Sequence, residues 1–140
     1  MKTAAILLGV LALAACGGHK PASPEAVARA WSAALDRNDN EAASRLFADG
    51  AQVVQGGELD LRSHQDFVRW TASLPCGGTI TSISHTRADE VIVTFRLTER
   101  PRHACDAPGA DAAAIFRVRD GKIVLWHQTE VPQPPQGQTV

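Results

Sequence analysis

The chain has 140 residues, with 14 lysine and arginine residues against 15 aspartate and glutamate residues, and a net charge of −1. This length is enough for one domain of ordinary size, and the balanced charge gives no basis for nucleic-acid binding. No apolar stretch beyond the N-terminal region approaches the roughly 18 residues that a membrane-spanning helix needs. The composition therefore indicates a single globular unit and excludes a nucleic-acid-binding domain or an integral membrane domain.

The first sixteen residues have the order of an export signal. Lys2 precedes an apolar run from Ala4 to Leu13, which is too short to span a bilayer permanently. The sequence Leu13-Ala14-Ala15-Cys16 resembles the cleavage motif of bacterial lipoproteins, in which the cysteine is lipidated with fatty acids such as palmitate. The resemblance implies a signal peptide at 1–15 and a lipidated linker at 16–23. An ordinary secretory signal with an incidental cysteine is the alternative.

The same resemblance predicts where the protein is located. Removing 15 residues from 140 leaves 125, and acylated Cys16 would hold them at the bacterial cell envelope. Gly17 directly after the cysteine is typical of lipoproteins sorted to the outer membrane, so the domain is expected there, facing the periplasm.

Two cysteines remain after Cys16. Cys76 and Cys105 form an even pair in an exported, oxidising compartment, which predicts a disulfide. A metal site that uses His103 and Cys105 is the alternative. The chain lacks the paired spacing of common metal motifs, so we expect neither a metal nor a cofactor.

Two longer helices are expected in the first half of the chain. Ser23 is predicted to cap a helix that continues to about Asn38. Ser63 and Asp66 resemble a capping box, and the helix they begin is expected to end at Pro75. Apolar residues recur at helical spacing in the first of these segments, at Val27, Ala30, Trp31, Ala34 and Leu35.

A shorter helix and a strand are expected between them. Asp39 is predicted to cap a helix that carries Leu46 and Phe47 inward and stops at Asp49-Gly50. Residues Ala51 to Gln55 are predicted to form a short strand that ends at a glycine pair.

The second half changes to a two-residue period, which is typical of strands. Strands are expected at Thr79–Arg87, Glu90–Thr98, Ala112–Arg119 and Lys122–Val131, with a tight hairpin at Asp120-Gly121. Helices followed by a strand meander predict an α+β fold, in which three N-terminal helices cover a curved antiparallel sheet.

Three stretches resemble the nuclear transport factor 2-like superfamily, which includes ketosteroid isomerases, scytalone dehydratase and polyketide cyclases. They are Leu35–Asp39, Leu46–Ala51 and Phe116–Ile123, and their order and spacing match over residues 24–131. The resemblance implies a cone-like domain over that range. An unrelated α+β sandwich is the alternative fold.

Residues 132–140 are rich in proline and glutamine and are expected to form a disordered tail, with a polyproline ligand as the alternative.

The resemblance also implies where catalytic groups would lie. The positions of the isomerase base, tyrosine and acid donor fall at Gln55, Trp31 and Ala114, and the chain contains no tyrosine. None of these side chains supplies the required proton transfer. We therefore expect no isomerase chemistry, and we favour a non-catalytic domain over an enzyme.

His127 is the alternative general base, since the resemblance includes dehydratase and cyclase relatives that use histidine. Strand alternation groups Ile123, Leu125 and His127 on one face, away from Val124, Trp126 and Gln128. A half-exposed strand histidine is the simpler interpretation, and the catalytic one requires His127 to face the cavity.

The leading hypothesis is a non-catalytic domain that binds a small apolar ligand or a protein partner. A homodimer through the sheet face that carries Ile92, Thr94, Ile115 and Arg117 is also expected from the resemblance. Large side chains could equally fill the space between helices and sheet. The residues predicted for a pocket are Trp31, Phe47, Gln55, Phe67, Trp70, Phe95, Phe116, Trp126 and Gln128.

Overall fold

The structure, a computed structural model, describes residues 17–134 and residue 137. The predicted signal peptide at 1–15, the lipidation of Cys16 and most of the predicted tail beyond residue 134 lie outside the described residues. Among the residues described, no helix combines the length and apolar character needed to cross a membrane.

Helix α1 (Pro24–Asp36) begins where the sequence predicts. The Ser23 hydroxyl oxygen accepts a hydrogen bond from the Ala26 N–H at 3.2 Å, and Pro24 occupies the first turn. The helix ends at Asp36, two residues earlier than predicted. Asn38 has a φ of 58°, a left-handed conformation that a right-handed helix cannot continue through.

Helix α2 (Asn40–Arg45) is shorter than predicted, and Phe47 is not part of it. Strand β1 (Phe47–Val54) begins at Phe47, because the Leu46 carbonyl accepts a hydrogen bond at 2.8 Å from the Ile123 N–H. The pairing with the last strand fixes an extended backbone at a position that helical spacing alone assigns to a helix. A two-residue strand, β2 (Glu58–Leu59), follows and was not predicted.

Helix α3 (His64–Ser73) confirms the predicted capping box. The Ser63 hydroxyl accepts from the Asp66 N–H at 3.2 Å, and the Asp66 carboxylate accepts from the Ser63 N–H at 2.8 Å. Hydrogen bonds from the Ser63 hydroxyl and from the backbone N–H groups of Arg62 and Ser63 hold the pKa of Asp66 below its usual range.

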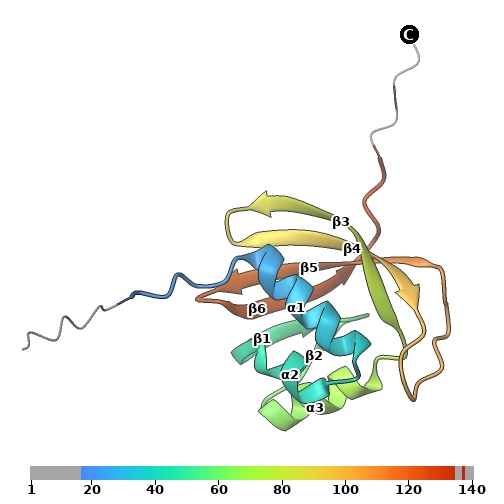
Figure 1. Cartoon of the computed structure of the whole chain (residues 1–140), viewed down its shortest axis with the longest axis horizontal. Helices are drawn as coiled ribbons and strands as arrows, with labels where there is room; N and C mark the ends of the chain where they lie inside the picture. The colour runs from blue at the N-terminus through green and yellow to red at the C-terminus, as the bar shows by residue number, and fades with distance from the viewer. Residues whose placement is uncertain (1–16, 135–136, 138–140) are drawn as a thin grey trace, which may run out of the picture.

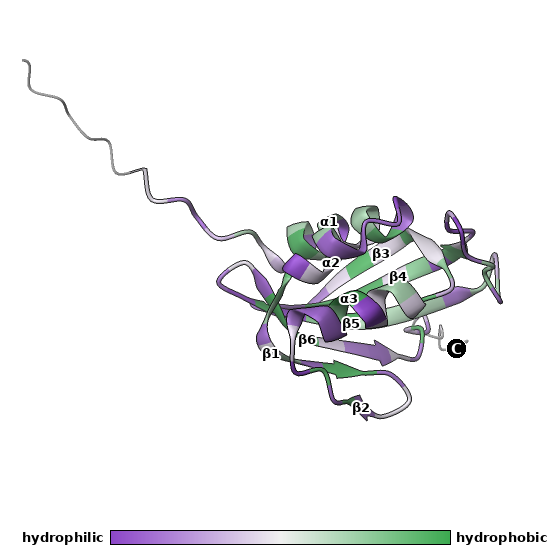
Figure 2. Ribbon diagram, turned by 90° about the horizontal axis from the view of Figure 1, so that it is seen from below, coloured by the Kyte–Doolittle hydropathy of each residue, from purple (hydrophilic) through white to green (hydrophobic). Residues whose placement is uncertain are grey.

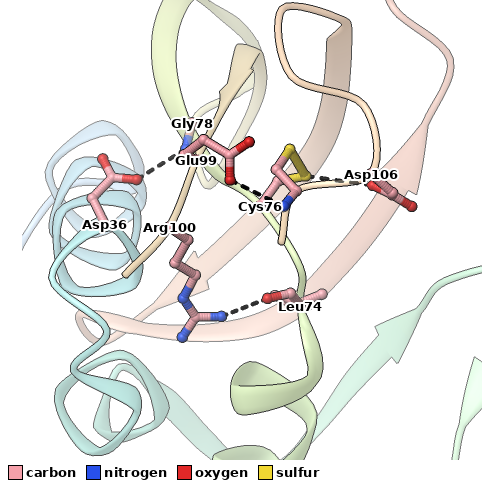
Figure 3. Close-up of a disulfide and its surroundings, with 8 residues drawn as sticks. Asp36, Leu74, Cys76, Gly78, Glu99, Arg100 and Asp106 are labelled. Atoms are coloured by element: carbon pink, nitrogen blue, oxygen red, sulfur yellow. Dashed lines mark hydrogen bonds between the residues drawn. A yellow bond between two sulfur atoms is a disulfide. The ribbon is translucent and has the colours of Figure 1, made fainter. Parts of the chain in front are cut away.

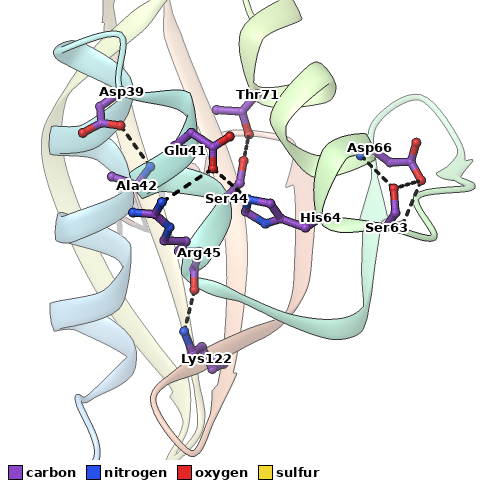
Figure 4. A network of polar contacts seen from close by, with 10 residues as sticks. All are labelled: Asp39, Glu41, Ala42, Ser44, Arg45, Ser63, His64, Asp66, Thr71 and Lys122. Carbon is purple, nitrogen blue, oxygen red and sulfur yellow. Dashed lines mark hydrogen bonds and ion pairs between the residues drawn. The ribbon is translucent and has the colours of Figure 1, made fainter.

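A polar network joins α2 to α3 (Figure 4). The His64 imidazole Nε2 lies 2.8 Å from a Glu41 carboxylate oxygen, and the hydroxyls of Ser44 and Thr71 lie 3.5 Å apart in the buried layer between the helices. His64 and Glu41 are exposed, so their ion pair contributes little to stability. The contact between Ser44 and Thr71 is buried between the two helices.

The sheet contains six strands in the order β2-β1-β6-β5-β4-β3 (Figure 1). The longer strands of the second half are β3 (Gly77–Arg87), β4 (Glu90–Thr98), β5 (Asp111–Arg119) and β6 (Lys122–Thr129). The predicted α+β fold class, with helices on a curved, open sheet, is confirmed. One pairing differs from the expected antiparallel arrangement, because β1 runs parallel to β6. Side-chain alternation in a strand does not encode the direction of its partner.

A β-bulge in β6 changes which residues face the core. Arg117 lies opposite Leu125 and Val118 opposite Ile123, so one extra residue is inserted in β6 between them. Ile123 and Trp126 are both buried as a result. The prediction that Ile123 shares a face with Leu125 and His127 is therefore wrong, since strict alternation does not hold across the bulge.

The core lies between α1 and the sheet. Helix α1 crosses β3 to β6, and apolar residues occupy the strands that pass beneath it (Figure 2). Trp31 is at the centre of this layer, with its ring centroid 5.5 Å from that of Phe116 and 5.9 Å from that of Trp126. The aromatic residues that were predicted to line a pocket thus belong to one continuous core.

Candidate ligand-binding site

A cavity of about 260 Å³ opens between α1 and one end of the sheet. It lies where β4 and β6 end and where β3 and β5 begin. The volume is just below the roughly 300 Å³ at which pockets for drug-sized ligands start, so the cavity suits a small molecule. Its walls include Trp31, Leu35, Gln55, Phe95, Trp126 and Gln128.

Small residues create this space. The inner end of β5 contributes Ala112, Ala113 and Ala114, and the start of β3 contributes Gly77 and Gly78. A Cβ atom on Gly78 would lie 3.1 Å from the Cβ of Phe95, which is closer than ordinary packing unless Phe95 itself shifts. Large side chains from α1 and β6 therefore face a wall of alanine and glycine, and the cavity results from that mismatch.

The three positions to which the family resemblance assigns isomerase catalytic groups come together here. Trp31, Gln55 and Ala114 all line the cavity. The amide oxygen of Gln55 accepts a hydrogen bond from the Trp70 indole N–H at 3.0 Å, which holds the side chain in place. An indole, an amide and a methyl group do not exchange protons near neutral pH, so these positions offer no acid and base pair.

The predicted pocket residues divide into two groups. Trp31, Gln55, Phe95, Trp126 and Gln128 line the cavity. The remaining predicted residues do not line it and pack in the core cluster instead, namely Phe47, Phe67, Trp70 and Phe116. Sequence periodicity identifies an inward-facing residue, but it does not show whether that residue meets a cavity or another side chain.

His127 does not line the cavity. Its neighbours Trp126 and Gln128 do, and alternation along the strand places His127 on the opposite face. There it lies across from Ile115 on β5 and Val54 on β1. The alternative in which His127 acts as a base inside the cavity does not agree with this placement.

A disulfide joins Cys76 and Cys105 (Figure 3), and Cys76 lines the cavity. Cys76 precedes β3, whereas Cys105 belongs to the loop between β4 and β5. The bond holds this loop against the mouth of the cavity, where Asp106 becomes a lining residue. The cysteine pair was predicted from the sequence, but its contact with the cavity and the role of Asp106 were not, because loop position carries no periodic signal.

Arg100 belongs to the same loop and attaches it to the helices. Its guanidinium donates hydrogen bonds to the carbonyl oxygens of Thr71 at 2.8 Å and Leu74 at 2.7 Å, and also to the Asn40 side-chain oxygen. The side chain is buried, and this burial lowers the pKa of Arg100 although the Asp36 carboxylate acts in the opposite direction. Arg100 thus joins the end of α3 to α2 and the β4–β5 loop.

The charge of the cavity is set by one side chain. Within the described part of the chain, Asp106 is the only lining residue with an ionisable side chain, and it forms no ion pair with a described residue. Its Oδ1 atom lies 3.5 Å from Cys76 Sγ, a disulfide sulfur that carries no proton. The cavity is thus apolar over most of its wall and negative at one edge.

Two cavity residues also bury unsatisfied donors. The indole N–H groups of Trp31 and Trp126 have no hydrogen-bond acceptor among the described residues. A buried donor without a partner typically costs about 1–3 kcal/mol. Both residues line the cavity, but the two indole nitrogen atoms are themselves buried.

Solved structures with the same fold share little sequence with this chain. An NTF2-like protein of unknown function from Cytophaga hutchinsonii is 9% identical, with a TM-score of 0.63 over 80% of this chain and 92% of that one. A protein from Sinorhizobium meliloti, described as a polyketide cyclase, is 18% identical, with a TM-score of 0.60 over 74% and 93%.

A third protein, from Catenulispora acidiphila, has a ketosteroid isomerase-like fold and was solved in complex with trimethylamine. It is 20% identical, with a TM-score of 0.63 over 78% of this chain and 87% of that one. A comparison with curated protein sequences finds no match. At these identities the structural likeness establishes the fold alone.

The sequence profile of the SnoaL-like domain matches residues 28–126. That range begins inside α1 and ends at Trp126 on β6, so it includes the helices, the sheet and nearly all of the cavity. The chain therefore belongs to the SnoaL-like domain family.

Proposed function

We propose that this domain binds a small, mostly apolar molecule in the cavity without converting it, as a lipid-anchored protein of the bacterial cell envelope. One observation carries the first part of the proposal. Trp31, Gln55 and Ala114, at the positions that the resemblance assigns to the isomerase groups, all line the cavity. The site keeps the enclosure that a ligand needs and lacks the proton-transfer groups that a reaction needs.

The composition of the walls supports binding. Leucine, alanine, proline and aromatic side chains dominate, and the amides of Gln55 and Gln128 supply a few polar contacts. A mainly apolar cavity with a few fixed polar groups is the usual form of a small-molecule site. The Catenulispora protein, solved in complex with trimethylamine, is an example of this fold with a small organic molecule.

The anchor rests on the N-terminal sequence. Pro21 and Ala22 pass next to Gly121 in the β5–β6 turn, whereas the cavity lies at the other end of the sheet. A strand of eight residues spans about 26 Å, so the tether and the cavity mouth are separated by roughly that length. An anchor at Cys16 would therefore leave the cavity end directed away from its attachment point, towards the periplasm.

Native mass spectrometry of the full chain, purified from membranes in mild detergent, tests ligand binding. We expect an additional mass that survives gentle ionisation and disappears on denaturation. After incubation with the protein, the identified molecule should keep both its mass and its NMR spectrum, because an isomerisation or a cyclisation would alter the spectrum without changing the mass. A change in either would contradict the non-catalytic proposal, and bare protein throughout a panel of small neutral, cationic and anionic molecules would contradict binding.

A separate experiment tests the anchor. The intact protein should partition into the detergent phase, and its N-terminal peptide should start at Cys16 with the mass of attached acyl chains. Cys16→Ala should abolish both results. An unmodified N-terminus elsewhere would indicate an ordinary secretory signal.

The homodimer is proposed through the outer sheet face. Ile92 and Ile115 lie opposite each other on β4 and β5 and are half-buried. Arg117 is already paired with Glu90 at 2.7 Å, and Thr94 is buried, so the two isoleucines are the available contacts. Light scattering should give a doubled mass for the native chain and a single mass for Ile115→Arg. A single mass for the native chain would contradict the dimer.

A further inference from the structure

We propose that the cavity selects small alkylammonium ions over neutral and anionic molecules of the same shape. The inference rests on the proposed binding function and deepens it by naming the ligand class. It follows from the combination of aromatic walls, a single negative side chain and the absence of a positive one among the described lining residues.

The aromatic walls suit an alkylated cation. Trp31, Phe95 and Trp126 line the cavity together, with the Trp31 ring centroid 6.4 Å from that of Phe95 and 5.9 Å from that of Trp126. Alkyl groups gain from contact with such apolar surfaces. The faces of indole and phenyl rings also attract a positive charge that lies within about 6 Å, and tryptophan does so most strongly.

Asp106 gives the cavity wall its negative charge. It is the only ionisable side chain on the cavity wall within the described residues, and no lysine, arginine or histidine in that part of the chain lines the cavity. Because Asp106 has no ion-pair partner there, its charge is not neutralised locally. A cation is attracted to this edge, and a carboxylate ligand is repelled.

Two further carboxylates, Asp36 and Glu99, lie in the surroundings of the Cys76–Cys105 disulfide (Figure 3). Asp36 accepts a hydrogen bond at 2.9 Å from the Gly78 N–H, and Glu99 accepts one at 3.2 Å from the Cys105 N–H. The nearby Arg100 is buried and donates to the Thr71 and Leu74 carbonyls and to Asn40, so its guanidinium does not line the cavity. Its positive charge offsets that of Asp36, so the negative field expected at the mouth comes from Asp106 and Glu99.

The test uses three molecules of nearly equal shape on the full chain. Choline and 3,3-dimethylbutan-1-ol differ only in whether the branched centre is a positive nitrogen or a carbon, and 3,3-dimethylbutanoate carries the opposite charge. Tryptophan fluorescence and calorimetry would follow binding at low ionic strength. Choline is expected to bind about tenfold more tightly than the alcohol, and the carboxylate more weakly than either.

Matched variants test whether Asp106 causes the preference for choline. Asp106→Asn should bring the choline affinity to within about threefold of the alcohol affinity measured on the same variant. Asp89→Asn removes the same charge at the β3–β4 turn, at the far end of the sheet, and should leave the preference intact. Added salt should reduce the preference of the native chain, because Asp106 is exposed.

Equal affinities for choline and the alcohol, tighter binding of the carboxylate, or no binding of choline would overturn the inference. Retention of the full choline preference in Asp106→Asn would overturn it as well. Binding of the alcohol without a preference for choline would leave the proposed ligand-binding function standing. Failure of the whole panel, together with bare protein in the mass spectrum, would remove both proposals.

Discussion

Cys76 and Cys105 connect the stability of the domain to the shape of its cavity. Cys76 lines the cavity, and its bond to Cys105 holds the β4–β5 loop, including Asp106, at the cavity mouth. A loop of this kind, rich in proline and turns and without regular structure, would otherwise sample many conformations. The disulfide therefore fixes a wall of the binding site as well as constraining the unfolded chain.

Removing the disulfide should lower both the stability of the domain and its affinity for the ligand. The bonded cysteines are 29 positions apart, for which the chain-entropy model gives about 3.5 kcal/mol of stability. We expect Cys76→Ala/Cys105→Ala to lower the free energy of unfolding by about that amount in a denaturant titration. Ligand affinity should fall further than the fraction of unfolded protein explains, and equal affinity in the folded variant would show that the loop wall is not needed.

Ala114→Leu should fill the cavity. Ala114 is buried on β5 at the cavity wall, and a leucine there would project into empty space. Binding should be lost, while thermal unfolding should shift by only a few degrees, since an apolar group fills an apolar void. Ala34→Leu in α1, buried away from the cavity, is the contrasting variant and should destabilise the domain by overpacking.

Arg100→Met should destabilise the domain by about 2–3 kcal/mol. The substitution preserves most of the side-chain length but leaves the carbonyls of Thr71 and Leu74 without these donors in a buried region. Chemical denaturation would measure the loss. Arg102→Met, on an exposed position of the same loop, should change stability by no more than about 0.5 kcal/mol. Equal effects of the two substitutions would contradict a structural role for Arg100.

Glu90 should make stability depend on acid pH. Burial alone would raise its pKa, but hydrogen bonds from Thr86, Arg117 and Arg87 outweigh burial and lower it. A carboxylate with a lowered pKa stabilises the fold above its unfolded-state pKa, and this contribution disappears as the pH falls through the lower, folded-state value. Thermal unfolding between about pH 7 and 3 should therefore show a steeper loss for the native chain than for Glu90→Gln, and parallel curves would contradict this.

His127→Ala should not change ligand binding. The imidazole lies on the face of β6 opposite to Trp126 and Gln128, outside the cavity. Gln128→Ala, one position further on, removes a lining side chain and should weaken binding by a few fold. A loss of binding or of any measured turnover in His127→Ala, with the fold intact by circular dichroism, would restore the catalytic interpretation of this histidine.

Local chemistry allowed much of the fold to be predicted. The cap at Ser23 and the capping box of Ser63 and Asp66 depend only on residues within one helical turn, so they could be identified from spacing. The Asp120-Gly121 hairpin is also local, since both residues adopt positive φ, 51° and 73°, as a tight turn requires. The main error lies where pairing with a strand far along the chain overrides local preference. Phe47 has helical spacing, but its pairing with β6 places it in a strand.

The candidate site was only partly predictable for the same reason. Inward-facing aromatic residues such as Trp31 and Trp126 follow from periodicity, and the family resemblance located Gln55 and Ala114 at the cavity. The sequence by itself thus determined the three helix starts, the four long strands of the second half, the cysteine pair and the lack of isomerase side chains at the positions that the resemblance assigns to them. Only the tertiary structure decided the parallel β1–β6 pairing, the bulge that aligns Ile123 with Trp126, and the position of Asp106 at the cavity mouth. These features depend on contacts between segments far apart in the chain, whose energies are not encoded in any local pattern.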